Sequence, residues 1–143
     1  MRLPMTPSAD ALYCADLQLR NFSQIPALNG NSIKCLSTDA AGNLYIGTDN
    51  GLYQMALSNA ITHYIHDSRD DASIPNNIVW ACFVDKWQNV WVGTDNGLSR
   101  LTTHTYYRYV SLDKITMSGE GNCLHAMLQT RNGEWWMGGT NGL

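Results

Sequence analysis

The sequence has little of what several common protein classes require. Only 15% of its 143 residues are charged and the formal net charge is −3, so it lacks the basic surface that nucleic-acid binding needs. The longest apolar run, residues 78–84, is seven residues long and too short to span a bilayer. Residues 1–7 lack the continuous apolar stretch of a signal peptide. We therefore expect neither nucleic-acid binding nor a membrane segment in this chain.

Cysteine and histidine patterns are equally sparse. The four cysteines form no Cys-x-x-Cys pair, and Cys35 and Cys82 fall in corresponding apolar strands, which is typical of small buried residues rather than of disulfides. His63, His66 and His104 are the only hint of a metal site. A His-x-x-His pair on a strand points its two rings to opposite faces, so we expect no metal and no cofactor.

What the sequence does contain is a nine-residue segment that occurs nearly three times, at 44–52, 90–98 and 135–143. The first two copies share Gly-Thr-Asp-Asn-Gly-Leu, and the third reads Gly-Gly-Thr-Asn-Gly-Leu. Each copy reads as a β-hairpin, in which an aromatic-bearing strand runs into an Asn-Gly turn and a second strand. The final leucines are 46 and then 45 residues apart, a period that favours the blades of a β-propeller.

Extending the repeats in both directions predicts an all-β chain without helices, because no window keeps a 3.6-residue apolar period. The strands expected of the first blade (33–66) are 33–38, 44–48, 52–57 and 61–66. Those of the second blade (78–110) are 78–84, 90–94, 98–101 and 105–110, followed by a loop over 111–122. A partial third blade (124–143) has strands 124–129 and 135–139.

Before these blades we expect a lead-in over residues 1–16 and, from its alternating pattern, an orphan outer strand over 17–22. The chain thus reads as an incomplete propeller of four-stranded antiparallel sheets over 17–143. A closed propeller needs at least four blades, so the remaining blades are expected elsewhere in a longer array. Alternatively, two chains exchange the orphan strand and complete a six-bladed ring as a homodimer.

These repeats resemble those of the two-component regulator propeller family. The features that carry the resemblance are an inner strand ending in Asp, a Gly-containing turn, an aromatic before Ile/Val-Gly-Thr, and Asn-Gly-Leu. It covers about residues 17–143. Two departures stand out, because Thr130 replaces the turn acid of Asp39 and Asp85, and Gln88 replaces the glycine of Gly42 and Gly133. Both departures predict altered turns.

The resemblance implies a function. Members of the family form the periplasmic sensor of hybrid two-component regulators, bind mostly oligosaccharides, and signal through a membrane helix to a histidine kinase. None of the kinase machinery is present in this chain, so we expect no enzymatic activity here. Two other function classes stay open. One is a propeller scaffold for protein–protein interaction, and the other is part of a carbohydrate-active propeller enzyme such as a sialidase or lyase.

Comparing the repeats with one another separates structural positions from candidate binding positions. Aromatic residues stand at Tyr45, Trp91 and Trp136 in every copy, so we expect them in the core between blades, and the glycines two residues later (Gly47, Gly93 and Gly138) meet a demand of every blade. Five residues before the turn acid, by contrast, the inner strands differ and carry Lys34, Trp80 and His125.

A cation, an indole and an imidazole near the start of the inner strands are suited to binding a sugar, because an indole stacks on apolar sugar faces while polar groups hydrogen-bond to the hydroxyls. Lys34, Trp80 and His125 are therefore the predicted ligand-binding residues, against the alternative of ordinary strand packing. Trp87, in the turn after Asp85, is a candidate surface contact for a partner.

Overall fold

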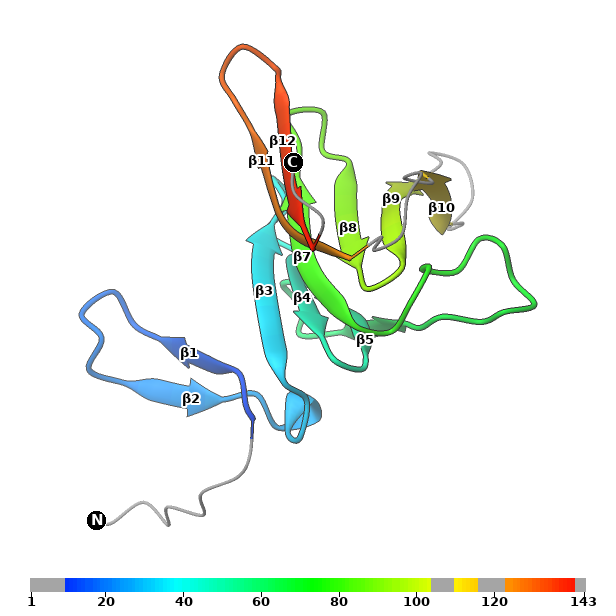
Figure 1. Cartoon of the computed structure of the whole chain (residues 1–143). Helices are drawn as coiled ribbons and strands as arrows, with labels where there is room; N and C mark the ends of the chain where they lie inside the picture. The colour runs from blue at the N-terminus through cyan, green and yellow to red at the C-terminus, as the bar shows by residue number, and fades with distance from the viewer. Residues whose placement is uncertain (1–9, 104–109, 116–122, 141–143) are drawn as a thin grey trace. The chain divides into compact units, whose positions relative to one another are not determined.

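The computed structural model describes residues 10–103, 110–115 and 123–140 (Figure 1). The chain divides into two compact units, Met1–Ile33 and Lys34–Leu143. Nearly all the regular structure in the described part is β, the exception being one 3₁₀ turn, η1 (Pro26–Leu28). Within the described residues no helix is long and apolar enough to cross a membrane.

The first unit holds an antiparallel hairpin of β1 (Tyr13–Ala15) and β2 (Phe22–Gln24). The expectation of an orphan outer strand over residues 17–22 is therefore wrong. The carboxylate of Asp16 accepts hydrogen bonds from the backbone N–H groups of Gln18 and Arg20, and these bonds hold the intervening residues in a turn. Leu17 is 99% exposed, so the apolar alternation read as a strand is solvated. The homodimer built on exchange of that strand loses its structural basis.

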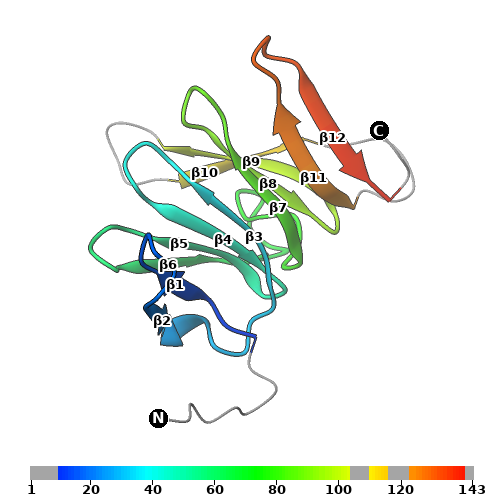
Figure 2. The same cartoon turned by 90° about the vertical axis from the view of Figure 1, so that its left-hand side faces the viewer.

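The described residues of the second unit form three antiparallel sheets (Figures 1 and 2). The first sheet has the order β3 (Ile33–Thr38), β4 (Leu44–Thr48), β5 (Gly51–Met55) and β6 (Ile61–Tyr64). The second has the order β7 (Val79–Val84), β8 (Val90–Thr94), β9 (Gly97–Thr103) and β10 (Val110–Ile115). The third pairs β11 (Leu124–Gln129) with β12 (Trp135–Gly139). β7 lies against β4, and β11 lies against β7 and β8, so successive sheets stack through their inner strands as propeller blades do.

The expected strands match the structure in the inner and second positions of all three sheets, except that β7 begins one residue later than expected, and their bounds differ in the third and fourth positions. The fourth strand of the second sheet is Val110–Ile115, not 105–110, and part of the expected loop 111–122 is therefore a strand. The pairing register with β9 defines the bounds of this strand, because Val110 pairs with Thr103 and Ile115 pairs with Leu98. Residues 104–109, which carry most of the expected strand, lie outside the described part.

The turns between the first two strands are the same in all three sheets, which corrects the expectation of altered turns. Each has one pair of backbone hydrogen bonds; in the second sheet these are Asp85 N–H to the carbonyl of Asn89 and Gln88 N–H to the carbonyl of Asp85. Gln88 has φ 68°, close to the 83° of Gly42 and 88° of Gly133. The left-handed conformation of Gln88 costs about 1 kcal/mol. Its side-chain Oε1 accepts a 2.7 Å hydrogen bond from the N–H of Ala40, in the turn between β3 and β4.

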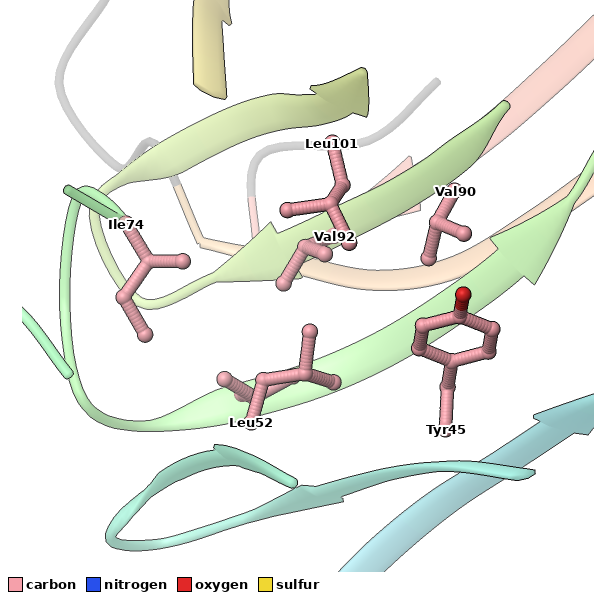
Figure 3. Packing of buried hydrophobic residues seen from close by; sticks show 7 residues of the cluster. Tyr45, Leu52, Ile74, Val90, Val92 and Leu101 are labelled. Atoms are coloured by element: carbon pink, nitrogen blue, oxygen red, sulfur yellow. The ribbon is translucent and has the colours of Figure 1, made fainter. Parts of the chain in front are cut away.

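Buried residues from the first two sheets and the segment between them form the main core. Figure 3 shows Tyr45 and Leu52 of the first sheet facing Val90, Val92 and Leu101 of the second. The space between sheets is tight at Gly47 and Gly93, two of the three repeated glycines. A Cβ atom on Gly93 would lie 2.9 Å from Cδ2 and 3.0 Å from the carbonyl oxygen of Leu124 in the third sheet. These glycines let neighbouring sheets approach.

The aromatic position of the repeat differs in burial from sheet to sheet. Tyr45 is buried and Trp91 is half-buried, but Trp136 is 52% exposed, so its expected place in a core between blades is wrong for the described chain. The reason lies in the stacking. Trp135 of the third sheet covers Trp91, with ring centroids 5.2 Å apart, whereas in the described residues no further sheet covers Trp136.

Cysteine reactivity should follow burial. All four cysteines are free thiols. Cys82 lies between the first two sheets, where a hydrogen bond with Cys35 and burial raise the pKa of its thiol. Because only the thiolate reacts, we expect a soluble disulfide reagent to modify the exposed Cys14 at least about tenfold faster than Cys82 in the native chain. Peptide mass mapping after timed labelling measures this, and equal rates in the native chain, rather than only in denaturant, would contradict the packing.

Candidate functional site

Two of the predicted binding residues occupy irregularities in the inner strands. The pairing of β7 with β8 shifts between Val79 and Ala81, and the pairing of β11 with β12 shifts between Leu124 and Ala126. Trp80 and His125 are the residues at these two shifts that have no partner in the strand pairing. A bulge re-aims the side chain that it carries, so both strands present this residue outside the regular alternation of the sheet.

The structure brings all three predicted residues together. The Nζ atom of Lys34 lies 4.9 Å from the ring centroid of Trp80, and the rings of Trp80 and His125 are 4.9 Å apart with a 46° tilt. Lys34 and His125 are exposed, and Trp80 is half-buried. We call this set, one residue from the inner strand of each sheet, the channel row. It offers an aromatic surface with a cation on one side and an imidazole on the other.

Three further residues complete the site and were not found from the sequence. The indole Nε1–H of Trp80 donates a 2.9 Å hydrogen bond to Oδ1 of Asp95, and the thiol of Cys123 donates to the same oxygen at 3.0 Å. Nε2 of His125 lies 3.2 Å from Sγ of Cys123 and 3.4 Å from Oγ1 of Thr140. Asp95 thus fixes the orientation of the central indole and links two sheets.

The sequence contains a feature from which the positions of Asp95 and Thr140 beside the channel row could have been predicted. Both stand at the same place in the repeated hairpin, directly after the second strand. In an antiparallel pair the end of the second strand lies beside the start of the first, and Thr94 indeed pairs with Val79. Residues at the turn therefore belong beside the channel row, although in the sequence they read only as turn formers.

Hydrogen bonds and burial set the protonation states of Asp95 and Cys123 in this cluster. Hydrogen bonds from the Cys123 thiol and the Trp80 indole lower the pKa of Asp95, so it is a carboxylate at neutral pH. Burial and the neighbouring Asp95 raise the pKa of Cys123, which keeps its thiol protonated and hence weakly nucleophilic. The site offers fixed hydrogen-bonding groups and an aromatic face.

Trp87 lies at the other end of the second sheet's inner strand, in the turn between β7 and β8. Its side chain is 64% exposed, and Nζ of Lys86 lies 4.4 Å from its ring centroid. The backbone N–H of Trp87 donates to the carboxylate of Asp85, which holds the turn that carries the ring. The ring is thus presented on a fixed turn, as a contact residue requires.

The histidines considered for a metal site have other roles. Nε2 of His63 lies 2.6 Å from the carbonyl oxygen of Asn50, and its ring stacks on Tyr53 at 3.9 Å. Nδ1 of His66 lies 2.8 Å from the carbonyl oxygen of Ile74. His104 falls outside the described residues. Within the described part, no three His, Cys, Asp or Glu side chains are placed to hold a metal ion.

Solved structures similar to this chain include extracellular domains of bacterial proteins. The extracellular domain of BT4673 from B. thetaiotaomicron, which is named both as a one component and as a hybrid two component system, is 31% identical over 90% of this chain, with a TM-score of 0.56. That of BT3049 from the same organism is 21% identical over 91% of the chain, with a TM-score of 0.61. The chain spans only 18% of the length of each of these domains.

A further similar structure is an enzyme. Virginiamycin B lyase from Staphylococcus aureus gives a TM-score of 0.68 over 90% of this chain and 42% of its own, but with 13% identity, so the likeness is one of fold alone. No match is found among curated proteins.

The family comparison agrees with the repeats. Residues 27–50 and 73–96 match the model of the two component regulator propeller. Each match contains the end of one connection, an inner strand, the turn acid and the following Gly-Thr-Asp-Asn. The chain therefore contains two repeats of the two-component regulator propeller family, at residues 27–50 and 73–96.

Proposed function

We propose that this chain is part of the periplasmic, ligand-sensing propeller of a hybrid two-component regulator, that it binds an oligosaccharide at the channel row, and that the parent protein passes the signal to a histidine kinase. The observation that carries the proposal is the contact series from Lys34 through Trp80 to His125, built from the same repeat position of three successive sheets. The proposed role is binding and a shift of domain position on ligand occupancy, without chemistry.

The contacts suit a sugar. The indole of Trp80 is locked by its hydrogen bond to Asp95, so stacking on it costs little conformational entropy. Lys34 has a long, exposed side chain, which can move off the ring to meet sugar hydroxyls. His125 and Thr140 add groups that donate or accept hydrogen bonds. One rigid aromatic face with polar groups around it is the arrangement expected of a carbohydrate subsite.

Calorimetry against a panel of glycan fragments tests the proposal. We expect saturable binding of at least one oligosaccharide and a rise in Kd of at least about tenfold, or about 1.4 kcal/mol, in Trp80→Ala. Trp136→Ala is the matched control, because it removes an exposed tryptophan outside the row and should leave Kd unchanged. Circular dichroism checks that both variants fold. Binding that is unaffected by changes at Lys34, Trp80 and His125 would disprove the site.

The same experiments separate the alternative functions. An interaction scaffold would bind no glycan but would bind a protein partner through Trp87, and this binding would be lost in Trp87→Ala. A carbohydrate-active enzyme would turn over an oligosaccharide in an activity screen. A blank screen together with saturable binding supports the sensor.

We also expect further propeller blades to cover the third sheet. Leu128 and Trp136 pair directly across β11 and β12 and are 57% and 52% exposed. The equivalent pair of the second sheet, Phe83 and Trp91, packs on Trp135 of its neighbour. A blade from the parent protein, or from a second copy in a homodimer, would cover the third sheet in the same way. Light scattering distinguishes these sources, since only the second gives a dimer of the isolated chain.

A further inference from the structure

A cavity of about 390 Å³ lies between the first and second sheets, at the end of the inner strands opposite the channel row. One wall is formed by the turn after β3, with Asp39 and Asn43, and by Tyr45 and Gln54. The other wall is formed by Gln88, Val90 and Leu101 of the second sheet. Lys34 lies in β3 and Asp39 directly follows this strand, so the two residues are five positions apart, or roughly 17 Å in an extended chain. The cavity is therefore separate from the channel row.

Comparison with the next junction explains why space exists here. Tyr45 and Gln54 pair across β4 and β5, as Trp91 and Arg100 pair across β8 and β9. Between the second and third sheets, Trp135 packs on Trp91 edge to face at 5.2 Å, and the guanidinium of Arg100 lies 5.5 Å from the Trp91 ring centroid.

Between the first and second sheets the equivalent residues are smaller. In the alignment of the repeats, Tyr45 is equivalent to Trp91, Val90 to Trp135 and Gln54 to Arg100. Figure 3 shows the Tyr45 ring pointing toward Val90. The same scaffold position is therefore filled by large side chains at one junction and left open at the other.

The polar groups of the cavity are held in place. Oε1 of Gln88 accepts from the N–H of Ala40 at 2.7 Å, and Oε1 of Gln54 accepts from the hydroxyl of Tyr64 at 2.8 Å. Because each side-chain oxygen is used in this way, the amide NH₂ of each glutamine is the group left to donate to a ligand.

The charge of the cavity selects against anions. The carboxylate of Asp39 accepts from the backbone N–H of Asn43 (2.9 Å), from its side-chain amide (2.7 Å) and from the hydroxyl of Tyr45 (3.1 Å). Burial opposes its ionisation, but these hydrogen bonds outweigh burial and lower the pKa of Asp39. A fixed negative charge beside amide donors and an apolar wall suits a neutral ligand with hydroxyl and ether oxygens.

We propose that this cavity between the first two sheets binds a small uncharged polyol of about the size of one hexose, held by the side-chain amides of Gln54 and Gln88 against Val90 and Leu101. This is a second site, independent of the oligosaccharide site at the channel row. Because it joins the turn of one blade to the strands of the next, its ligand would stiffen the junction between them.

Titrations followed by nuclear magnetic resonance test the site on the 143-residue chain. The probes are D-glucose, D-galactose and N-acetyl-D-glucosamine, with D-glucuronate as the anionic comparison. We expect at least one neutral probe to shift the side-chain amide signals of Gln54 and Gln88 in a saturable manner, and glucuronate to shift them at least about tenfold more weakly. The absence of a saturable shift with every neutral probe would overturn the proposal.

Two variants then locate the site. Gln88→Gly copies Gly133, which has the same backbone conformation in the third sheet, and Gln54→Glu keeps the acceptor for Tyr64 while removing the amide donor. Each should raise the Kd of the neutral probe at least about tenfold. Trp80→Ala distinguishes the two sites: if it abolishes the amide shifts, the probe binds at the channel row and the cavity proposal fails. If the side-chain amide signals of Gln54 and Gln88 still shift in this variant while oligosaccharide binding is lost, the cavity is a binding site separate from the channel row.

Discussion

Replacing Gly47 by alanine is expected to destabilise the chain by about 2–3 kcal/mol. The added Cβ atom would lie 2.7 Å from Cγ1 of Val79 in the second sheet and against Sγ of Cys35 in its own sheet. These contacts are below the distances that real Cβ atoms adopt, and β4 and β7 belong to stacked sheets that have to move apart to relieve them. Thermal unfolding followed by circular dichroism should show a lower Tm, by roughly 5–10 °C.

The matched control for this change lies in the third sheet. Gly138 occupies the same repeat position, but the nearest heavy atom to an added Cβ there is Cβ of Ala126 at 3.9 Å, an ordinary contact. Gly138→Ala should therefore change the free energy of unfolding by less than about 0.5 kcal/mol. Equal destabilisation by both changes would mean that the glycine serves the hairpin itself rather than the stacking of sheets.

This pair of expectations also shows what internal repeats reveal about the fold. The glycine and aromatic positions recur in all three copies, so the strands that hold them could be predicted from one sequence, and β3, β4, β8, β11 and β12 have the expected bounds. The role of a position still depends on its neighbours. Trp136 matches Trp91 in the repeat, yet it is exposed because no described sheet covers it.

The channel row was predictable for a related reason. Lys34, Trp80 and His125 differ in chemistry where the scaffold is equivalent, and equivalent positions of stacked blades lie side by side. The bulges at Trp80 and His125 and the bond from Trp80 to Asp95 were not predictable, because register shifts and side-chain partners depend on pairing across strands.

The errors have local physical causes. The apolar alternation over 17–22 favoured a strand, but the Asp16 carboxylate binds the backbone and imposes a turn there. Gln88 was expected to alter its turn, but the two backbone hydrogen bonds of that turn are enough to hold a glutamine at positive φ. In both places a few hydrogen bonds outweigh residue propensity.

The turn acids of the repeats should contribute in proportion to the hydrogen bonds they accept. Asp85 is only 3% exposed. Its carboxylate accepts from the backbone N–H groups of Trp87 and Asn89 (both 2.9 Å), the Asn89 side chain (3.0 Å) and the indole of Trp91 (2.9 Å). Asp85→Ala leaves these donors without their acceptor, and we expect a loss of about 3–5 kcal/mol in the free energy of unfolding, measured by urea denaturation.

Two other turns supply the comparison. Asp39 is half-buried and its donor Tyr45 can turn its hydroxyl elsewhere, so Asp39→Ala should cost about half as much as Asp85→Ala. Thr130 takes this place in the third sheet and its hydroxyl accepts one bond, from the N–H of Glu134 at 3.1 Å. Thr130→Ala should cost about 1 kcal/mol. Losses of equal size at all three positions would show that the turn backbone, not the acid, stabilises the blade.

Acid titration provides an independent measurement of the same bonds. Burial opposes the ionisation of Asp85, but the hydrogen bonds from Trp91, Asn89 and Trp87 outweigh it and lower its pKa in the folded chain below the usual value. The stabilisation is therefore complete above the unfolded pKa of about 4 and is lost as the pH falls through the lower folded value. Between about pH 5 and pH 2 the unmodified chain should lose stability more steeply than the Asp85→Asn variant, because the asparagine at position 85 does not titrate. Parallel pH profiles for the two chains would show that the Asp85 carboxylate is not selectively stabilised by the fold, and the strong effect expected of Asp85→Ala would then need another cause.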